Sequence, residues 1–218
     1  DKESAMRSLD RLEPMFQPSS IAVVGASDDE GKYGHKVLRN IVEGGYQGRI
    51  YPVNPNASIV MGLTSYPSLQ HIRDIVDLSC IVIPASRVPE AVKDAIVAGV
   101  RSLVIISAGF GETGRDGMET QIEIGTLCKS AGLPAVGPNC MGICSFARSL
   151  SATMETLRSE PGHVSFISQS GTYGITTLNY GVRMSVRFNK FISSGNEAVT
   201  NFEDYLEYVG RDDDTRVI

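Results

Sequence analysis

Two short glycine-containing turns hold the residues best suited to chemistry in this sequence. The first is Gly137-Pro-Asn-Cys-Met-Gly142, which places an amide, a thiol and a glycine after an apolar segment. The second is Ile167-Ser-Gln-Ser-Gly-Thr172, in which an apolar strand runs into a glycine that opens a helix. Backbone N–H groups at such a turn can bind a phosphate. The two turns therefore indicate a protein that brings a phosphorylated group to a bound cofactor.

A third loop, from Gly25 to Gly34, has the composition of a phosphate-binding turn. It follows the apolar segment 21–24 and opens a predicted helix, so its glycines allow an anion to approach the helix N-terminus. Its spacing differs from G-x-G-x-x-G, and the acidic residue expected about 20 residues later in NAD-binding proteins is replaced by Val53-Asn54-Pro55. The loop favours a phosphate-bearing ligand other than NAD, and a tight turn that binds nothing is the alternative.

Two further segments are expected beside these loops. Ile83-Pro84-Ala85-Ser86 and Ser107-Ala108-Gly109-Phe110 each follow an apolar strand. Ligands of open α/β sheets bind at the carboxyl ends of the strands, and small residues there leave room for a flat group.

The elements that must position these loops alternate along the chain. Apolar segments predict strands at 21–24, 49–53, 78–83, 103–106 and 134–136, with helices between them at 34–43, 88–99 and 118–131. Buried strands that alternate with helices are typical of a parallel sheet. We therefore predict an α/β fold with a Rossmann-like doubly wound parallel sheet.

The composition changes along the chain in a way that predicts two domains. We expect a lead-in segment at 1–13, a first domain at 14–148, a linker at 149–162 rich in Ser, Thr and Glu, and a second domain at 163–218. The second domain has predicted strands at 164–167 and 188–192 and helices at 171–184 and 200–209. A further strand begins near 215, so the second domain is expected to be incomplete.

Charge and hydropathy exclude several classes of protein. The net charge of −5 argues against a large nucleic-acid surface, which needs clustered Lys and Arg. No apolar run has the roughly 20 residues that a membrane span needs. The four cysteines lack metal-ligand spacing, so we expect free thiols, no metal site and a cytoplasmic protein.

Six ordered motifs resemble those of the NDP-forming acyl-CoA synthetases, the family of the ADP-forming acetyl-CoA synthetases and the succinyl-CoA synthetase α subunit. The motifs are Ile21-Ala-Val-Val-Gly-Ala-Ser27, Tyr51-Pro-Val-Asn-Pro55, Ile83-Pro-Ala85, Ile105-Ile-Ser-Ala-Gly-Phe110 with Glu112-Thr-Gly114, Gly137-Pro-Asn-Cys140 and Phe166-Ile-Ser-Gln-Ser-Gly171. The resemblance implies a CoA-binding domain followed by the first part of a flavodoxin-like, succinyl-CoA synthetase-like domain.

The resemblance also implies which residues bind CoA. The loop after the first strand would hold the CoA phosphates, the segments at 53–55 and 83–85 would border the nucleotide end, and 107–109 would lie along the pantetheine arm. The turn at 139–140 would lie near the thiol. The residues implied are Gly25, Ala26, Ser27, Asp28, Gly31, Lys32, Tyr33, Gly34, Val53, Asn54, Pro55, Ile83, Pro84, Ala85, Ser107, Ala108, Gly109, Asn139 and Cys140.

For catalysis, the resemblance implies that Ser170 and Gly171 hold the phosphate of a phosphohistidine and that Glu207 orients the histidine ring. The reaction would convert an acid, CoA and ATP into acyl-CoA, ADP and phosphate. The substrates would be CoA and a small carboxylic acid. A partner ATP-grasp domain or β subunit would bind ATP, ADP and Mg, and an oligomer is expected.

Two departures from the family pattern limit the prediction. Asn56 stands where many relatives have a lysine that helps bind CoA, and none of the three histidines matches the phosphorylated one, which lies beyond residue 218 in the family. His35 could touch a cofactor phosphate or face solvent. For Cys140 we favour a buried inert thiol over a nucleophile. The alternative function is a non-catalytic CoA-binding module, such as the synthetase-like half of a protein acyltransferase.

Overall fold

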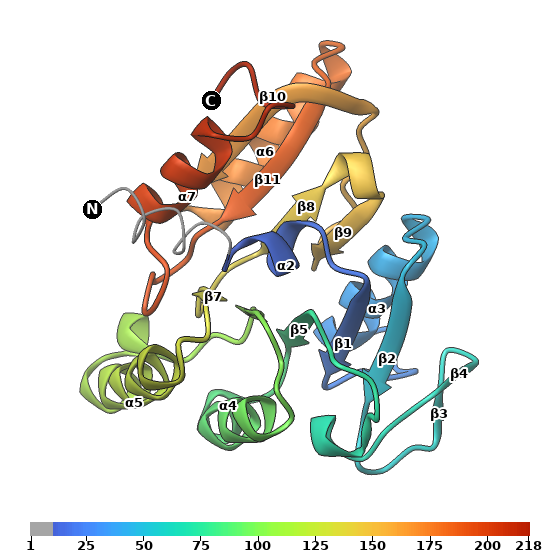
Figure 1. Cartoon of the computed structure of the whole chain (residues 1–218), viewed down its shortest axis with the longest axis vertical. Helices are drawn as coiled ribbons and strands as arrows, with labels where there is room; N and C mark the ends of the chain where they lie inside the picture. Colours follow the sequence, from blue (N-terminus) through green and yellow to red (C-terminus); the bar gives the residue numbers. More distant parts are fainter. Residues whose placement is uncertain (1–10) are drawn as a thin grey trace.

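The computed structural model describes residues 11–218, in which two sheets lie side by side (Figure 1). Most of the segment 1–13, predicted to be a lead-in, lies outside the described residues. Within them, the short helix α2 (Glu13–Phe16) precedes the first strand. The first sheet has five parallel strands in the order β2-β1-β5-β6-β7. Its strands are β1 (Ser20–Val24), β2 (Arg49–Val53), β5 (Leu78–Ile81), β6 (Leu103–Ile105) and β7 (Ala135–Val136).

The strand order reverses between β1 and β5, because β2 lies on one side of β1 and the later strands lie on the other. Such a reversal opens a crevice at the carboxyl ends of the two central strands. The helices of this unit are α3 (Tyr33–Glu43), α4 (Val88–Val97) and α5 (Arg115–Ala131), and a hairpin of β3 (Ile59–Val60) and β4 (Leu63–Thr64) follows β2. The predicted doubly wound parallel sheet is confirmed.

Alternate residues of the central strands enter two different hydrophobic cores. Leu78 and Cys80 of β5 pack on the side of α3, whereas Ile81 packs on the side of α4 and α5. Successive side chains of a strand point to opposite faces, so a continuous apolar strand is buried on both. The helices α4 and α5 lie side by side over one face (Figure 1).

The second sheet is mixed and has the strand order β10-β11-β8-β9. Its strands are β8 (Gly142–Ser145), β9 (Leu150–Thr153), β10 (Pro161–Ser168) and β11 (Phe188–Ser193), and its helices are α6 (Gly171–Arg183) and α7 (Phe202–Gly210). The pair β10 and β11 is parallel, and β8 runs antiparallel to both β11 and β9. The strand expected near 215 is present only as one bridge, between Val164 and Val217.

The stretch 149–162, expected to be a linker, contains the buried strand β9. Three of its residues, Ser151, Ala152 and Thr153, are small or hydroxylated, which is also the composition of a loop. Here the hydroxyls are satisfied inside the fold: the Ser151 and Thr153 hydroxyls lie 3.1 Å apart, and Thr153 donates to the Glu155 carbonyl at 2.7 Å. Buried polar groups with partners are tolerated in a strand, so composition alone did not reveal the strand inside this segment.

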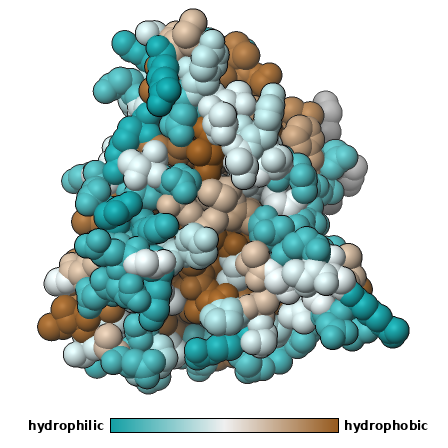
Figure 2. All heavy atoms as spheres, turned by 180° about the vertical axis from the view of Figure 1, so that it is seen from behind, coloured by the Kyte–Doolittle hydropathy of each residue, from teal (hydrophilic) through white to brown (hydrophobic). Residues whose placement is uncertain are grey.

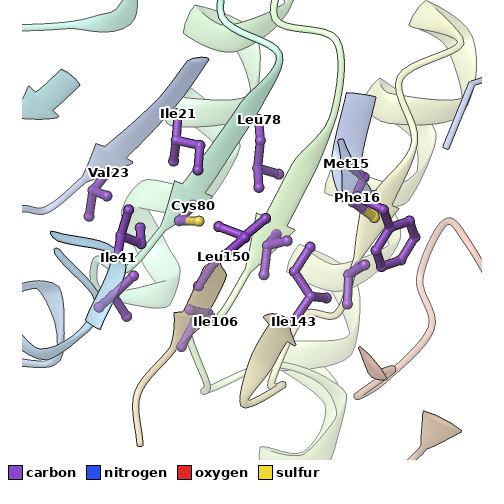
Figure 3. Packing of buried hydrophobic residues seen from close by; sticks show 14 of the residues in the cluster. Met15, Phe16, Ile21, Val23, Ile41, Leu78, Cys80, Ile106, Ile143 and Leu150 are labelled. Atoms are coloured by element: carbon purple, nitrogen blue, oxygen red, sulfur yellow. The ribbon is translucent and has the colours of Figure 1, made fainter. Parts of the chain in front are cut away.

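One hydrophobic core joins the two sheets (Figure 3). Ile21 and Leu78 of the first sheet share it with Ile143 and Leu150 of the second, and Phe16 of α2 closes one end. The Phe16 ring stacks on Tyr208 of α7 at a centroid distance of 4.9 Å. Because these contacts are apolar and buried, the two sheets pack as one body in the structure.

Part of the apolar surface remains exposed. Seen from behind, the molecule carries hydrophobic residues along its middle and also at its lower left and upper right edges (Figure 2). The exposed large apolar side chains include Tyr173, Tyr180 and Met184, which all belong to α6 or directly follow it. Among residues 11–218, no helix is long and apolar enough to cross a membrane.

Candidate functional site

A cavity of about 1400 Å³ opens at the carboxyl edge of the first sheet and extends to the start of α6. It lies where the strand order reverses, which is the expected ligand position in an open α/β sheet. The predicted residues that line it are Gly25, Ala26, Ser27, Gly31, Lys32, Tyr33, Gly34, Val53, Asn54, Pro55, Ile83, Pro84, Ser107, Ala108, Asn139, Cys140, Ser170 and Gly171.

Two glycines let the loop after β1 fold tightly against its neighbours. Gly25 has a φ of +95°, and a Cβ there would lie 2.3 Å from the Val82 carbonyl oxygen. A Cβ on Gly34 would lie 1.9 Å from the Gly25 carbonyl oxygen. Neither position has room for a side chain. The two glycines therefore bring the first turn of α3 directly onto the end of β1.

The loop between these glycines is held by its own hydrogen bonds. The Asp29 N–H donates to the Ser27 hydroxyl at 3.1 Å, and the Gly31 N–H donates to the Asp29 carboxylate at 2.9 Å. His35 is buried, and its Nδ1 lies 3.0 Å from the Ser27 carbonyl oxygen. The buried His35 ring thus contacts the backbone of the loop. This position differs from both alternatives considered for it, a phosphate contact and a solvent-facing ring.

The N-terminus of α3 has no side-chain cap. The first N–H groups of a helix lack partners within the helix, and they carry partial positive charge. Lys32 stands at the N-cap position, and both Lys32 and Tyr33 line the cavity. This end of the cavity can therefore accept an anion.

The Asn54 side chain connects the segment after β2 to the loop after β1 by hydrogen bonds. Its side-chain amide donates to the Ala26 carbonyl at 2.9 Å, and its side-chain oxygen accepts from the Asn56 N–H at 2.9 Å. Both ends of the side chain are used, so Asn54 fixes the end of β2 against the loop after β1. Asp28 does not line the cavity; its carboxylate accepts from the Met61 N–H at 2.7 Å and ties the same loop to the β3–β4 hairpin.

The wall between the strand ends is fixed by Ser107. Its hydroxyl accepts from the Ile83 N–H at 3.1 Å and contacts the Ile81 carbonyl at 3.4 Å. Ala85 and Gly109, both predicted to line the site, are not among the residues that line the cavity. A Cβ on Gly109 would lie 3.2 Å from the Ala85 Cβ, so these two residues pack against each other.

Asn139 and Cys140 lie on the cavity wall after β7. Asn139 has a φ of 57°, and its N–H donates to the Ser107 carbonyl at 2.9 Å. The Cys140 thiol contacts the Ile105 carbonyl oxygen at 3.4 Å. Burial raises the pKa of Cys140 to about 12. A thiol with this pKa is almost wholly protonated at neutral pH, which favours the inert role over the nucleophile.

Ser170 and Gly171 begin α6 at the opposite end of the cavity. Ser170 is the N-cap, and its hydroxyl accepts from the Tyr173 N–H at 3.4 Å. A Cβ on Gly171 would lie 2.2 Å from the Met141 Cγ, so only glycine fits between α6 and the turn after β7. The N–H groups that open α6 therefore face the same cavity as the start of α3.

The structure does not bring Glu207 to this cavity. Glu207 lies on α7, pairs with Arg211 and lines a separate, smaller cavity of about 210 Å³. Its predicted role, which is to orient the ring of a histidine, stays a prediction.

Several lining residues escaped the sequence-based prediction. Arg87 follows β5 and contributes a cation to the wall, opposite in sign to Glu90 and Asp94 of α4. Its position two residues after Ile83-Pro84-Ala85 was a usable signal. Met141, Met154 and Gln169 also line the cavity, and Met154 directly follows β9. Among residues 11–218, no group of three or more His, Cys, Asp and Glu side chains is arranged to hold a metal ion.

Comparison with known families accounts for nearly the whole chain. Residues 19–145 match the family described as a CoA binding domain. Residues 161–218 match the succinyl-CoA ligase like flavodoxin domain.

Individual relatives agree with these matches. The chain is 38% identical over 207 residues to acetate–CoA ligase [ADP-forming] I of Archaeoglobus fulgidus, covering 95% of this chain and 30% of that protein. It is 39% identical to the α subunit of acetate–CoA ligase [ADP-forming] II of Pyrococcus furiosus, covering 95% of this chain and 45% of the subunit. The chain thus spans less than half the length of either relative.

A solved structure has the same fold over most of the chain. It is the dinucleotide-forming acetyl-coenzyme A synthetase 1 of Ca. Korarchaeum cryptofilum in complex with phosphate and ADP. The two agree with a TM-score of 0.90 at 38% identity, over 94% of this chain and 44% of that one.

Proposed function

This chain belongs to the NDP-forming acyl-CoA synthetases, whose CoA-binding domain it carries, and on that premise we propose that it is the CoA-binding part of an acid–thiol ligase. The reaction converts a small carboxylic acid, CoA and ATP into acyl-CoA, ADP and phosphate, by way of an acyl phosphate and a phosphohistidine. The observation that carries the proposal is the single cavity lined by both the loop after β1 and the start of α6.

The dimensions and chemistry of the cavity fit CoA. Its volume of about 1400 Å³ exceeds the 300–1,000 Å³ of most ligand sites, so a long ligand with several parts has room. Lys32 and the uncapped start of α3 suit the phosphates, and Arg87 supplies a cation that compensates for Asn56. CoA would supply the thiol that accepts the acyl group.

The residues at the far end of the cavity suit a phosphate. The N–H groups at Gly171 and Thr172 open α6 and have no intrahelical partners. In the proposed reaction they bind the phosphate carried by the histidine, and they stabilise its charge without a metal. Asn139 and the protonated Cys140 would border the thiol of CoA. We propose that Glu207, on α7 beside the smaller cavity, orients the ring of the histidine that carries the phosphate.

The remaining steps are assigned to other parts of the enzyme. We propose that an ATP-grasp domain or β subunit binds ATP, ADP and Mg and that the complete enzyme is an oligomer acting in the cytoplasm. The apolar side chains exposed on α6 offer a surface on which another part of the complete enzyme could pack. We propose that this chain alone is inactive.

Calorimetry on the full-length protein tests the proposal. CoA should bind more tightly than NADH, because Asn54 stands where NAD-binding proteins have an acidic residue that binds the ribose hydroxyls. The Asn54 side-chain amide already donates to the Ala26 carbonyl. Tighter binding of NADH than of CoA would contradict the assignment.

A further inference from the structure

The loop after β11, residues 194–198, lies across the turn after β7. The Gly137 N–H donates to the Ser194 carbonyl at 3.1 Å, and the Asn196 N–H donates to the Pro138 carbonyl at 2.9 Å. A Cβ on Gly195 would lie 2.4 Å from the Pro138 carbonyl oxygen. This loop of the second sheet is therefore in direct backbone contact with the cavity wall of the first.

The side chain of Asn196 uses all of its polar atoms at this contact. Its oxygen accepts from the Asn139 side-chain amide at 3.2 Å. Its amide donates to the Glu112 carboxylate at 2.7 Å and to the Gln121 side-chain oxygen at 2.9 Å. Asn196 thus connects Asn139, on the cavity wall, to two residues of the first domain that do not line the cavity.

Glu112 anchors the other end of this connection. One of its oxygens accepts from the Gly109 N–H at 2.6 Å and from the Phe110 N–H at 3.1 Å. Partial burial opposes its ionisation, but the donors at Gly109, Asn196 and Phe110 outweigh burial and hold the pKa of Glu112 below its usual value. Glu112 is therefore ionised at neutral pH, and it fixes the loop that contains Ser107 and Ala108.

A third contact extends the connection to the start of α6. The Gln169 side-chain amide donates to the Gly195 carbonyl at 3.2 Å. Gln169 immediately precedes Ser170 and lines the cavity. The loop 194–198 therefore touches the turn after β7 and the turn before α6, at the two places where the proposed thiol and phosphate sites lie.

We propose that Asn196 is a positioning residue that, together with Glu112, holds Asn139 in place and sets the spacing between the CoA-thiol wall and the phosphate-binding turn. The inference rests on the proposed function, since it assigns these residues to the CoA cavity. Asn139 has a left-handed backbone that is uncommon for a residue other than glycine, and its side chain depends on Asn196 for its hydrogen bond.

Substitutions in the full-length protein test this assignment. For Asn196→Ala we expect the Kd for CoA to rise about tenfold, because such hydrogen bonds each contribute modestly and several are lost together. Hydrogen exchange should become faster at 137–141 and at 169–172. Ser194→Ala is the matched control: it removes the 2.6 Å hydrogen bond from Ser194 to Glu197 in the same loop and leaves Asn139 untouched, so CoA affinity and exchange should match wild type.

A rescue experiment separates positioning from general loss of stability. Glu112→Gln points an amide nitrogen at the Asn196 side-chain amide, which is itself a donor. Asn196→Asp places a second carboxylate against that of Glu112. Each single variant should therefore weaken CoA binding. In the double variant Glu112→Gln/Asn196→Asp the new amide donates to the new carboxylate. CoA affinity should therefore recover above that of either single variant, which independent sites would not produce.

The outcomes are distinguishable. Wild-type affinity for CoA in Asn196→Ala, or a double variant that binds CoA no more tightly than the tighter-binding single variant, would overturn the positioning role while leaving the proposed function intact. Absence of CoA binding by the wild-type protein would overturn the proposed function itself.

Discussion

Gly31 offers a substitution that separates ligand binding from folding. Its φ lies outside the left-handed region, and a Cβ there would meet only the Asp29 carboxylate oxygen, at 3.2 Å. The residue is exposed and lines the cavity. Gly31→Ala and Gly31→Val should therefore leave the fold intact, while the added carbons keep a phosphate away from the loop N–H groups.

The expected loss follows from the bonds at stake. A hydrogen bond to a charged group contributes about 1.5–3 kcal/mol, so displacing one phosphate contact should raise the Kd for CoA about 10- to 150-fold. Valine should have a larger effect than alanine because it is bulkier. Removing a glycine can also stabilise the protein by about 0.4–1 kcal/mol through the unfolded chain, so Tm should stay level or rise slightly.

Calorimetry with CoA and a thermal melt on the same samples provide the measurement. Gly25→Ala is the contrasting variant, since Gly25 has a φ of +95° and no space for a Cβ. The strained backbone alone costs about 1–3 kcal/mol, and each kcal/mol lowers Tm by about 2–4 °C in a protein of this size. Unchanged CoA affinity in folded Gly31→Val would refute the reasoning, because the loop would then serve only the fold.

The buried thiols give two further predictions. In the full-length enzyme, Cys140→Ser should keep most of the turnover, and steady-state kinetics would contradict this if the loss were comparable to that from removing the phosphohistidine. Burial also raises the pKa values of Cys128 and Cys144 to about 12, well above those of an unfolded chain. At pH values between the thiol pKa of the unfolded chain and that of the folded protein, the unfolded state binds fewer protons than the folded state, so stability should fall as pH rises above about 9. Urea unfolding should therefore show a lower midpoint at pH 10 than at pH 7. An equal or higher midpoint at pH 10 would contradict this.

Local patterns in the sequence were sufficient to predict the first sheet and most of its cavity. Continuous apolar strands, glycine stops and small residues at strand ends are local signals, and they located the loops after β1, β5 and β6. Even the packing role of Gly25 and Gly34 follows from their places at the end of a strand and the start of a helix. The topology then brings these loops together, because all the strands are parallel.

The parts that escaped prediction depend on contacts between distant residues. The strand β9 has the composition of a loop and becomes a strand only through its pairing with β8. The hydrogen bond between Asn139 and Asn196 joins residues 57 positions apart, so no local spacing could reveal it. Contacts of this kind become visible only when both sheets are placed.

The assignment as part of an acid–thiol ligase is tested most directly by phosphoenzyme formation. The full-length protein with its ATP-grasp partner, given acyl-CoA, ADP and labelled phosphate, should form ATP and carry acid-labile phosphate. Ser170→Asp should suppress that phosphate by placing like charge at the start of α6, and this chain alone should acquire none. Failure of the complete enzyme to form phosphoenzyme, or acid-labile phosphate on His35, His71 or His163, would contradict the account.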